Sequence, residues 1–291
     1  MKSSASIIYN PAARKASAAN IARAVSYLAK EGYGVEVLRT EKKDHARLLA
    51  RGMIEKRPAL VIAAGGDGTV NEVINGLVWS DVPAALLPMG TTNVLAKELN
   101  LPEDLYGALN VAVHGRPRKV SLGRIETEDG PARYFCLMAG IGLDGKAVHD
   151  VNRSLKKVSG GAAYILSGIR TIARYSPDRI VILVDGREYA GYTAVVGNAS
   201  KYGGNFRVTP DANLLDPFLY VSIFQGGGRL DLLRYSIGVI RGSHLRFRDV
   251  VYLKASVIKV LGKAHIQVDG DYLGLGPARI SVAESALSLI F

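Results

Sequence analysis

The sequence lacks the residues that define several common classes of protein. Its 291 residues include one cysteine, Cys136, which excludes an intramolecular disulfide and a cysteine-based zinc site. The five histidines are scattered, without the spacing of metal ligands. No apolar run reaches the roughly 18 residues of a membrane-spanning helix, and the N-terminal stretch is too short and polar for a signal peptide. We therefore expect a soluble, cytoplasmic protein.

Acidic residues are also scarce relative to basic ones. There are 37 Lys and Arg against 26 Asp and Glu, a net charge of +11. Such a surface favours anionic partners, namely nucleotides, nucleic acid or an anionic membrane. Because the basic residues are spread along the chain and no nucleic-acid-binding motif is present, nucleic acid is not expected as a partner. We expect peripheral association with an anionic membrane surface.

The order of apolar runs divides the chain into two expected domains. Over residues 1–118, strand-like runs alternate with helical patterns, which predicts a doubly wound α/β domain with a parallel sheet. Its expected strands are 6–9, 34–40, 60–64 and 84–88, and its helices are 17–31, 44–56, one from Thr69 and one ending near Leu99.

Residues 119–291 are predicted to form a β-rich domain, because strand-like runs dominate there. Asp185-Gly186 and Asp269-Gly270 have the chemistry of hairpin turns, and one helix is expected over about 161–175. The last residues are candidates for packing back on the first domain. The expected strands are 120–126, 133–141, 180–184, 192–198, 219–224, 250–261 and 265–268.

The segment 59–77, ALVIAAGGDGTVNEVINGL, is the most informative part of the chain. An apolar run breaks into Gly65-Gly66-Asp67-Gly68-Thr69, and a helical pattern follows at once. Thr69 and Glu72 fit a capping box, which places the helix start at Thr69. Glycines before a helix N-terminus form a site suited to phosphate. Asp67 suits a bare anion site poorly, so its presence favours a metal ion or a reacting hydroxyl nearby.

Three further loops follow expected strands of the same sheet. They contain Asn10, Thr40 and Gly90-Thr91-Thr92-Asn93. Ligands of doubly wound sheets bind outside the carboxyl ends of the strands. We therefore expect these loops to lie at one edge together with Gly65–Thr69.

The motifs along the whole chain resemble those of the bacterial diacylglycerol kinase-like lipid kinases, relatives of sphingosine and ceramide kinases. The resemblance begins at Asn10-Pro11 and continues through the GGDGTxNEVxNG segment at 65–76 and the loop 88–93. It includes Asn198 and Gly203-Gly204, and then the segments 210–216 and 268–271.

This resemblance implies a nucleotide-binding α/β domain, a β-sandwich-like lipid-side domain, and phosphorylation of a lipid hydroxyl, such as that of diacylglycerol, with ATP and Mg²⁺. Its implied partners are a lipid substrate and, in a homodimer, a second copy of the chain. It implies magnesium binding by Asp216 with the carbonyls of Asn213 and Phe218. The residues that it implies for nucleotide binding are Asn10, Thr40, Gly65, Gly66, Asp67, Gly68, Thr69, Asn71, Glu72, Gly90, Thr91 and Asn93.

Several positions depart from the family pattern. Asp271 stands where the family has a catalytic Glu, and Asp67 is a rival candidate for the general base. Ser121 replaces an Asp of the magnesium network, and Pro217 follows Asp216 in place of Gly. In the first loop, Arg14 or Lys15 would contact phosphate, or the pair would be a solvated helix start.

Two other functions stay open, the first because of these departures. One is a non-catalytic relative that binds lipid or nucleotide without turnover. The other is an NAD kinase-like enzyme, which shares Gly65–Thr69 but predicts further pyridine-nucleotide motifs that this sequence does not have. Arg153, Lys156 and Lys157 would dock on anionic headgroups or form a solvated cationic face.

Overall fold

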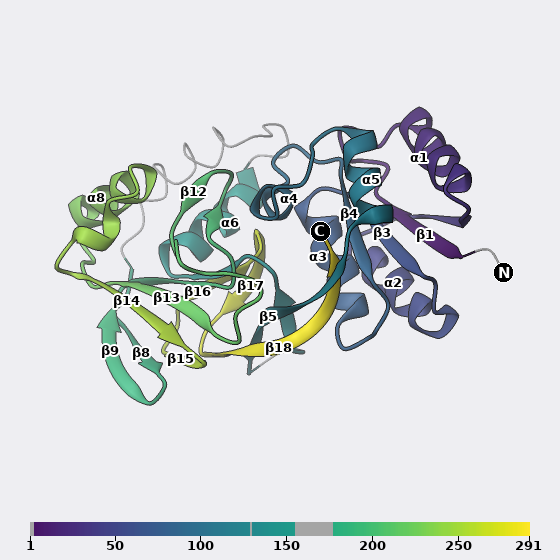
Figure 1. The fold of residues 1–291 in the computed structure, drawn as a ribbon. Helices are drawn as coiled ribbons and strands as arrows, with labels where there is room; N and C mark the ends of the chain where they lie inside the picture. The colour runs from purple at the N-terminus through teal and green to yellow at the C-terminus, as the bar shows by residue number, and fades with distance from the viewer. Residues whose placement is uncertain (1–2, 129, 155–176) are drawn as a thin grey trace. The chain divides into compact units, whose positions relative to one another are not determined.

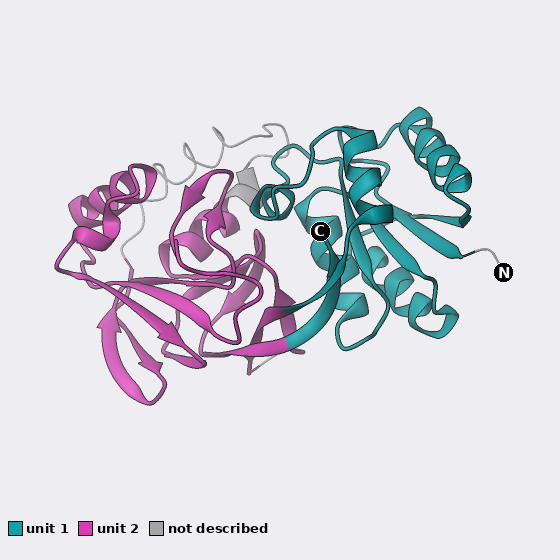
Figure 2. Ribbon diagram, viewed as in Figure 1, with its two compact units in different colours: residues 1–120, 285–291 teal, residues 121–284 magenta. Residues whose placement is uncertain are grey.

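The computed structural model describes residues 3–128, 130–154 and 177–291. The chain divides into two compact units, coloured separately in Figure 2. Unit 1 comprises residues 1–120 and 285–291, and unit 2 comprises residues 121–284. The final seven residues therefore belong to the unit formed by the N-terminal part of the chain.

Unit 1 is built on a parallel sheet with the strand order β2-β1-β3-β4. Next to β4 lies the end of β18, where Leu289 pairs with Ala84 in parallel register. Strands β1, β3 and β4 are buried because each is a short apolar run covered on both faces, as is usual for parallel sheets, whereas the edge strand β2 is partly exposed. Their bounds are β1 Ser4–Tyr9, β2 Gly34–Arg39, β3 Leu60–Gly65 and β4 Ala84–Pro88.

Helices cover both faces of this sheet (Figure 1). One core cluster joins Ile7 and Ile62 of the sheet to Leu28 of α1 and Leu109 of α5. The pair α2 and α3 packs on the other face, where α2 contacts β1 and α3 contacts β3. The helices are α1 Ala18–Lys30, α2 His45–Lys56, α3 Asp67–Leu77, α4 Val94–Glu98 and α5 Leu105–His114.

The doubly wound α/β prediction is confirmed, but the predicted start of α3 is wrong. The helix begins at Asp67, after Gly66, and has no side-chain cap. Thr69 is already inside the helix, so the Thr69–Glu72 capping box does not form. The N–H of Val70 bonds to the Gly66 carbonyl at 3.1 Å, which fixes the earlier start.

Unit 2 is a β-sandwich-like unit with two antiparallel layers. One layer has the order β14-β13-β10-β7-β16-β17. In the other, β15 lies between β8 and the first part of β18, and β9 follows β8. The strands are β5 Pro117–Thr127, β6 Arg133–Phe135, β7 Met138–Ile141, β8 Ile180–Val184, β9 Arg187–Gly191, β10 Thr193–Gly197, β13 Leu219–Phe224, β14 Val250–Ala255, β15 Val257–Leu261, β16 His265–Val268, β17 Asp271–Leu275 and β18 Ala278–Ile290.

The core of unit 2 fills the space between these layers. Ile141, Val196 and Ile266 from one layer pack with Ile182 and Ile258 from the other. Along each contributing strand, every second side chain points into this core. The β-rich character expected from the sequence follows from this alternation.

Both predicted hairpin turns are present in unit 2. Asp185 and Asp269 have φ values of 46° and 45°, and the glycines that follow them have φ values of 86° and 87°. Positive φ at both central residues defines the tight turn that matches the strand twist. The turns join β8 to β9 and β16 to β17.

Several elements of unit 2 differ from the expected pattern. The predicted strand 250–261 is two strands, separated at Ser256, and 133–141 is likewise divided. The structure also has helices and short strands that the sequence analysis did not predict: α6 Leu143–Ser154, α8 Arg229–Ile240, the 3₁₀ turn η1 His244–Arg246, β11 Lys201–Tyr202 and β12 Phe206–Arg207. Among the described residues, no helix is long and apolar enough to cross a membrane.

One group of predictions lies outside the described residues. These are the helix expected over 161–175, the two lysines Lys156 and Lys157, and the side chain of Arg153.

Candidate active site

The candidate site of unit 1 begins where the winding of the sheet reverses. Strand β1 lies between β2 and β3, so the connection after β1 leads to β2 on one side, whereas the connection after β3 leads to β4 on the other. Such a point leaves a crevice at the carboxyl ends of the strands. Asn10 follows β1, and its Nδ2 donates to Oγ1 of Thr69 at 3.3 Å. The loops after β1 and β3 are thereby joined at the switch point.

Glycines let the loops after β3 and β4 approach backbone to backbone. A Cβ on Gly90 would lie 2.5 Å from Cα of Gly66, which no side chain tolerates. A Cβ on Gly65 would lie 2.5 Å from Cβ of Thr69. The first N–H groups of α3 have no carbonyl partner within the helix, and they lie in this glycine-lined turn. The arrangement suits a phosphate group, because N–H donors and the helix dipole both favour an anion.

Asp67 is held by the neighbouring loop of the same unit. Its Oδ1 accepts from the backbone N–H of Leu95, in the first turn of α4, at 3.3 Å. Burial raises the pKa of the Asp67 carboxyl above its usual value, while the backbone N–H groups of Leu95 and Val94 oppose that rise. This contact gives the acidic residue a structural partner inside the glycine turn, and the carboxylate stays next to the start of α3.

The second half of the GGDGTxNEVxNG segment faces α2. The two carboxylate oxygens of Glu72 accept from the N–H groups of Asp44 and Ala46, at 2.9 and 3.1 Å. Glu72 of α3 therefore caps the N-terminus of α2. Asp44 occupies the N-cap position of α2, but its side chain makes no capping hydrogen bond. A Cβ on Gly76 would meet the Arg47 carbonyl at 2.5 Å. The segment thus combines a ligand-suited turn with a helix-packing surface, and sequence reasoning missed the second role.

The remaining residues predicted to bind nucleotide lie on the same loops and helix. Asn93 closes the loop after β4, because its Oδ1 accepts from the Gly90 N–H at 2.9 Å. Thr40 is buried, and its N–H bonds to the Tyr9 carbonyl at 2.9 Å. Asn71 is buried on α3 and accepts from Asn75 Nδ2, whereas Thr91 is exposed. The contacts described above connect most of the predicted nucleotide-binding residues of the three loops, namely Asn10, Gly65, Gly66, Asp67, Thr69, Gly90 and Asn93. Thr40 and Asn71 have other hydrogen-bond partners.

The two cationic candidates of the first loop are placed differently. Lys15 Nζ donates to the Glu103 carbonyl at 3.2 Å, so the described structure turns it toward the residues before α5. Arg14 is exposed.

In unit 2, the Asp269-Gly270 turn does more than reverse the chain. The Asp269 carboxylate accepts from the N–H groups of Cys136, Leu137 and Met138 at 2.8–2.9 Å. Asp185 does the same on a smaller scale for Ser256 and Val257. Each Asp-Gly turn therefore pins a neighbouring segment through its Asp.

The three hydrogen bonds from the N–H groups of residues 136–138 to Asp269 are called the Asp269 latch below. Asp271 begins β17, two residues after Asp269. Its side chain is 35% exposed, and Oδ2 lies 3.8 Å from Arg133 NH2. The Asp269 latch fixes the segment 136–138 beside the turn, and Asp271 leaves the turn as the first strand residue. The Asp271 carboxylate therefore remains accessible, which is a requirement for a candidate general base.

The predicted magnesium residues lie in the turn before β13. Asp216 N–H bonds to the Asn213 carbonyl at 3.0 Å, and Leu215 N–H bonds to Asn213 Oδ1 at 3.0 Å. Ser121 N–H bonds to the Leu214 carbonyl of the same turn at 2.7 Å. One carboxylate with several carbonyls is a donor set that suits magnesium with bound waters. The described residues contain no cluster of three or more His, Cys, Asp or Glu side chains suited to a metal.

A partly buried polar group in unit 2 was not predicted from the sequence. Asp144, on α6, accepts from Gln267 Nε2 at 2.6 Å and from the Tyr202 hydroxyl. Burial raises the pKa of its carboxyl. The sequence signal is a glycine four residues before the aspartate, in Gly140-Ile-Gly-Leu-Asp144. The structure gives the reason for that glycine, because a Cβ on Gly140 would overlap the Asp144 carboxylate.

Comparison with known proteins identifies the family. Residues 4–125 match the diacylglycerol kinase catalytic domain, and residues 138–291 match the YegS C-terminal NAD kinase beta sandwich-like domain. The chain belongs to the diacylglycerol kinase family, in agreement with the resemblance read from its motifs.

The similarity to relatives extends over almost the whole chain. A diacylglycerol kinase of Bacillus subtilis (strain 168) is 31% identical over 281 residues, which cover 94% of this chain and 91% of the relative. One from Staphylococcus aureus (strain bovine RF122 / ET3-1) is 31% identical, with 96% and 89% covered. A crystal structure of a diacylglycerol kinase from Bacillus anthracis str. Sterne shares the fold, with a TM-score of 0.80, 24% identity and coverage of 100% and 97%.

Proposed function

We propose that this protein is a lipid kinase that transfers the γ-phosphoryl group of ATP, with Mg²⁺, to a lipid hydroxyl such as that of diacylglycerol. The observation that carries the proposal is the glycine turn at the start of α3, where Gly66 and Gly90 meet beside Asp67. Family membership and relatives named diacylglycerol kinase support the same activity.

In this proposal, unit 1 positions the phosphates. Phosphoryl transfer depends mainly on positioning and on stabilisation of charge. The N–H groups at the start of α3 would hold phosphate oxygens, and the Asn10–Thr69 bond would keep the adjoining loop in place. The Gly66–Gly90 contact would hold the two loops rigidly enough for this purpose.

Two carboxylates are proposed for the remaining catalytic work. Asp67 would hold magnesium that neutralises the phosphate charge, because its carboxylate lies next to the phosphate-suited turn. Asp271 would accept the proton of the lipid hydroxyl, and the Asp269 latch would position it. In the turn before β13, Asp216 with the carbonyls of Asn213 and Phe218 would hold a second, structural magnesium.

The lipid substrate brings the proposed enzyme to a membrane. The net charge of +11 would draw it to an anionic surface, and salt would weaken this attraction. Peripheral association would let the active site reach a hydroxyl at the headgroup level.

Transfer of radiolabel from ATP across a panel of lipids tests the proposal directly. The panel contains diacylglycerol, phosphatidylglycerol, sphingosine and undecaprenol, each in mixed micelles with magnesium. We expect label in at least one lipid and highest transfer to diacylglycerol. Asp67→Asn serves as the negative control. Binding of ATP without label in any lipid, and without hydrolysis, would instead indicate a relative that has lost turnover.

A further inference from the structure

Helix α8 of unit 2 has apolar side chains on its outer surface as well as its inner one. Leu232 and Tyr235 point into the unit and are buried. The outer positions hold Leu230, which is 83% exposed, with Leu233, Ile237 and Ile240 at 40–50%. A surface helix of a soluble protein normally has charged or polar side chains at such positions.

The exposed apolar residues of α8 form a stripe. Positions 230, 233, 237 and 240 recur at intervals of three and four, so they fall on one side of the helix. Eleven large apolar side chains are exposed among the described residues, and four of them belong to this one helix. Isolated exposed apolar residues are ordinary, but a continuous stripe marks a contact surface.

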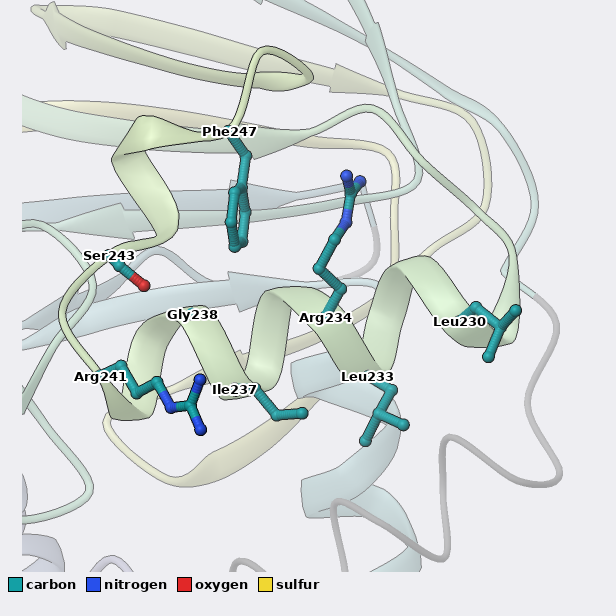
Figure 3. Close-up of a pocket in the computed structure, with 8 residues that line it drawn as sticks. All are labelled: Leu230, Leu233, Arg234, Ile237, Gly238, Arg241, Ser243 and Phe247. Carbon is teal, nitrogen blue, oxygen red and sulfur yellow. The ribbon is translucent and has the colours of Figure 1, made fainter.

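A groove runs along the same helix (Figure 3). It has a volume of about 360 Å³, and its lining combines Leu230, Leu233 and Ile237 with Arg241 and Phe247. Leu233, Ile237 and Arg241 project from the same side of the helix in the close-up. An acyl chain or the glycerol region of a lipid would meet apolar carbons there, with a guanidinium at the end of the stripe.

The charge around the groove is strongly positive. Residues 229–249 contain five arginines and two aspartates. Both aspartates are engaged by Arg234, which also lies over the ring of Phe247 at 5.1 Å. Arg229, Arg241, Arg246 and Arg248 are exposed, and none has an ion pair within the described part of the chain.

The helix is firmly attached to unit 2, so the stripe is a stable surface feature. The Tyr235 hydroxyl donates to Asp249 at 2.5 Å and accepts from the Gly226 N–H at 2.8 Å. Burial and the neighbouring Asp249 carboxylate raise the pKa of Tyr235 to about 12. The outward residues take no part in the anchor.

We propose that this surface, the outer face of α8 with its flanking arginines, docks the protein on an anionic lipid bilayer. The apolar stripe inserts among the lipids at the level of the headgroups, and Arg229 and Arg241, at the two ends of α8, lie against phosphate groups. Apolar side chains bordered by arginine are the chemistry of a helix lying in a membrane interface. The proposal deepens the proposed lipid kinase function, since it names the surface that binds the membrane.

Vesicle co-sedimentation with single variants tests the surface. The vesicles contain phosphatidylcholine alone, or equal parts of phosphatidylcholine and phosphatidylglycerol. We expect Leu230→Gln to weaken binding to the anionic vesicles about tenfold, and Arg241→Gln about fivefold. Each has a matched control in unit 2: Leu261→Gln, at an exposed leucine of β15, and Lys259→Gln, at an exposed lysine of that strand. Neither control should change binding more than twofold.

A fluorescence measurement checks insertion directly. The chain has one tryptophan, Trp79, in unit 1. In a Trp79→Phe background, Leu230→Trp reports on the α8 surface alone. We expect its emission to shift to the blue on adding anionic vesicles, and to be quenched by lipids with brominated acyl chains. An unshifted, unquenched emission from vesicle-bound protein would overturn the proposal.

Two other outcomes are distinguishable. Phosphorylation of a soluble short-chain diacylglycerol should be unchanged in Leu230→Gln, because α8 contributes nothing to the candidate active site. If neither the wild type nor any variant has kinase activity, but vesicle binding still depends on α8, the proposed function is contradicted. The docking surface is then unaffected. A dimer in lipid-free solution that Leu230→Gln dissociates would assign the stripe to a second copy of the chain and overturn the docking proposal.

Discussion

Gly66 and Gly90 place two loops of unit 1 in direct backbone contact. A Cβ at Gly90 would lie 2.5 Å from the Gly66 Cα and 2.8 Å from Asn93 Oδ1. The second contact matters because Asn93 Oδ1 already accepts from the Gly90 N–H at 2.9 Å. The loop after β4 is thus held to the glycine turn by shape and by this internal bond.

Gly90→Ala should therefore destabilise unit 1 and weaken nucleotide binding. The added methyl group forces the two backbones apart, with an expected loss of about 1–3 kcal/mol of unfolding free energy. Urea unfolding measures the loss. Gly68→Ala is the matched control, because a Cβ at Gly68 meets nothing within 4 Å, and alanine in a helix should leave stability equal or slightly raised. Equal unfolding midpoints for the two variants would contradict the close approach.

Glu72→Ala should destabilise the protein through α2. It removes both acceptors of the Asp44 and Ala46 N–H groups, and lost helix caps typically cost about 1–2 kcal/mol. Glu72→Gln keeps one acceptor oxygen and should recover about half of the loss. The same two variants decide the predicted nucleotide role of Glu72. A rise in the KM for ATP in Glu72→Gln, measured at a temperature at which the variant is fully folded, would support that role.

The position of Glu72 shows where sequence reasoning succeeded and where it stopped. The order strand, glycine turn and helix predicted β3 and α3, because apolar periodicity and glycine are local signals. The partner of Glu72 is 26–28 residues away in the chain, so no local pattern shows it. Thr69 and Glu72 fit a capping box by spacing alone, and tertiary contacts with Asn10 and α2 replaced it.

Asp67→Asn should reduce phosphoryl transfer about 100-fold or more while the fold persists. The amide oxygen can still accept from the Leu95 N–H, so the loop contact survives, whereas the charge needed for magnesium is lost. Single-turnover transfer at saturating magnesium measures the effect. More than half of the wild-type rate would exclude Asp67 from this role.

The pH dependence of the same carboxylate has a definite sign. Burial raises the pKa of Asp67 above 3.8, so protonation sets in at a higher pH than for a solvated aspartate. Transfer should therefore fall on the acid side as pH drops through that raised value, because the protonated form binds magnesium poorly. The acid limb should be absent from the residual activity of Asp67→Asn.

Asp269→Asn should be far more damaging than Asp185→Asn, although both residues occupy the first position of an Asp-Gly turn. Asparagine tolerates the left-handed conformation of both turns, so the comparison isolates the carboxylate. Asp269 accepts three N–H groups of a buried segment, and its loss should cost about 2–4 kcal/mol, against about 1 kcal/mol for the exposed Asp185. Thermal unfolding of the two variants gives the ranking, and equal midpoints would show that the latch contributes nothing.

The elements of unit 2 that were not predicted from the sequence were missed for different physical reasons. The apolar residues of α8 occupy both faces of the helix, so its sequence lacks the amphipathic period that marks a helix. The split at Ser256 depends on its N–H bonding to Asp185, a residue 71 positions away. The hairpin turns were predictable because Asp-Gly determines the turn locally, while the latch of Asp269 on 136–138 depends on the folded sandwich.

The last prediction concerns Asp271 as the proposed general base. Asp271→Asn should lower kcat with little change in the KM for ATP, because the residue would act only on the proton of the acceptor. Asp271→Glu tests reach: the longer side chain leaves the same turn and should retain or raise activity on a glycerol-type lipid. Lys259→Gln, an exposed substitution in the same unit, should leave kcat unchanged.

The ion pair with Arg133 decides how the result is read. Asp271 Oδ2 lies 3.8 Å from Arg133 NH2, and half-exposed pairs of this kind stabilise a protein by at most about 1 kcal/mol. A purely structural Asp271 would therefore give Asp271→Asn a slightly lower unfolding midpoint and an unchanged kcat. A catalytic Asp271 would give the opposite pattern, with a large fall in kcat at nearly unchanged stability. Unchanged kcat in Asp271→Asn would transfer the role of base to Asp67, the carboxylate beside the proposed phosphate site of unit 1.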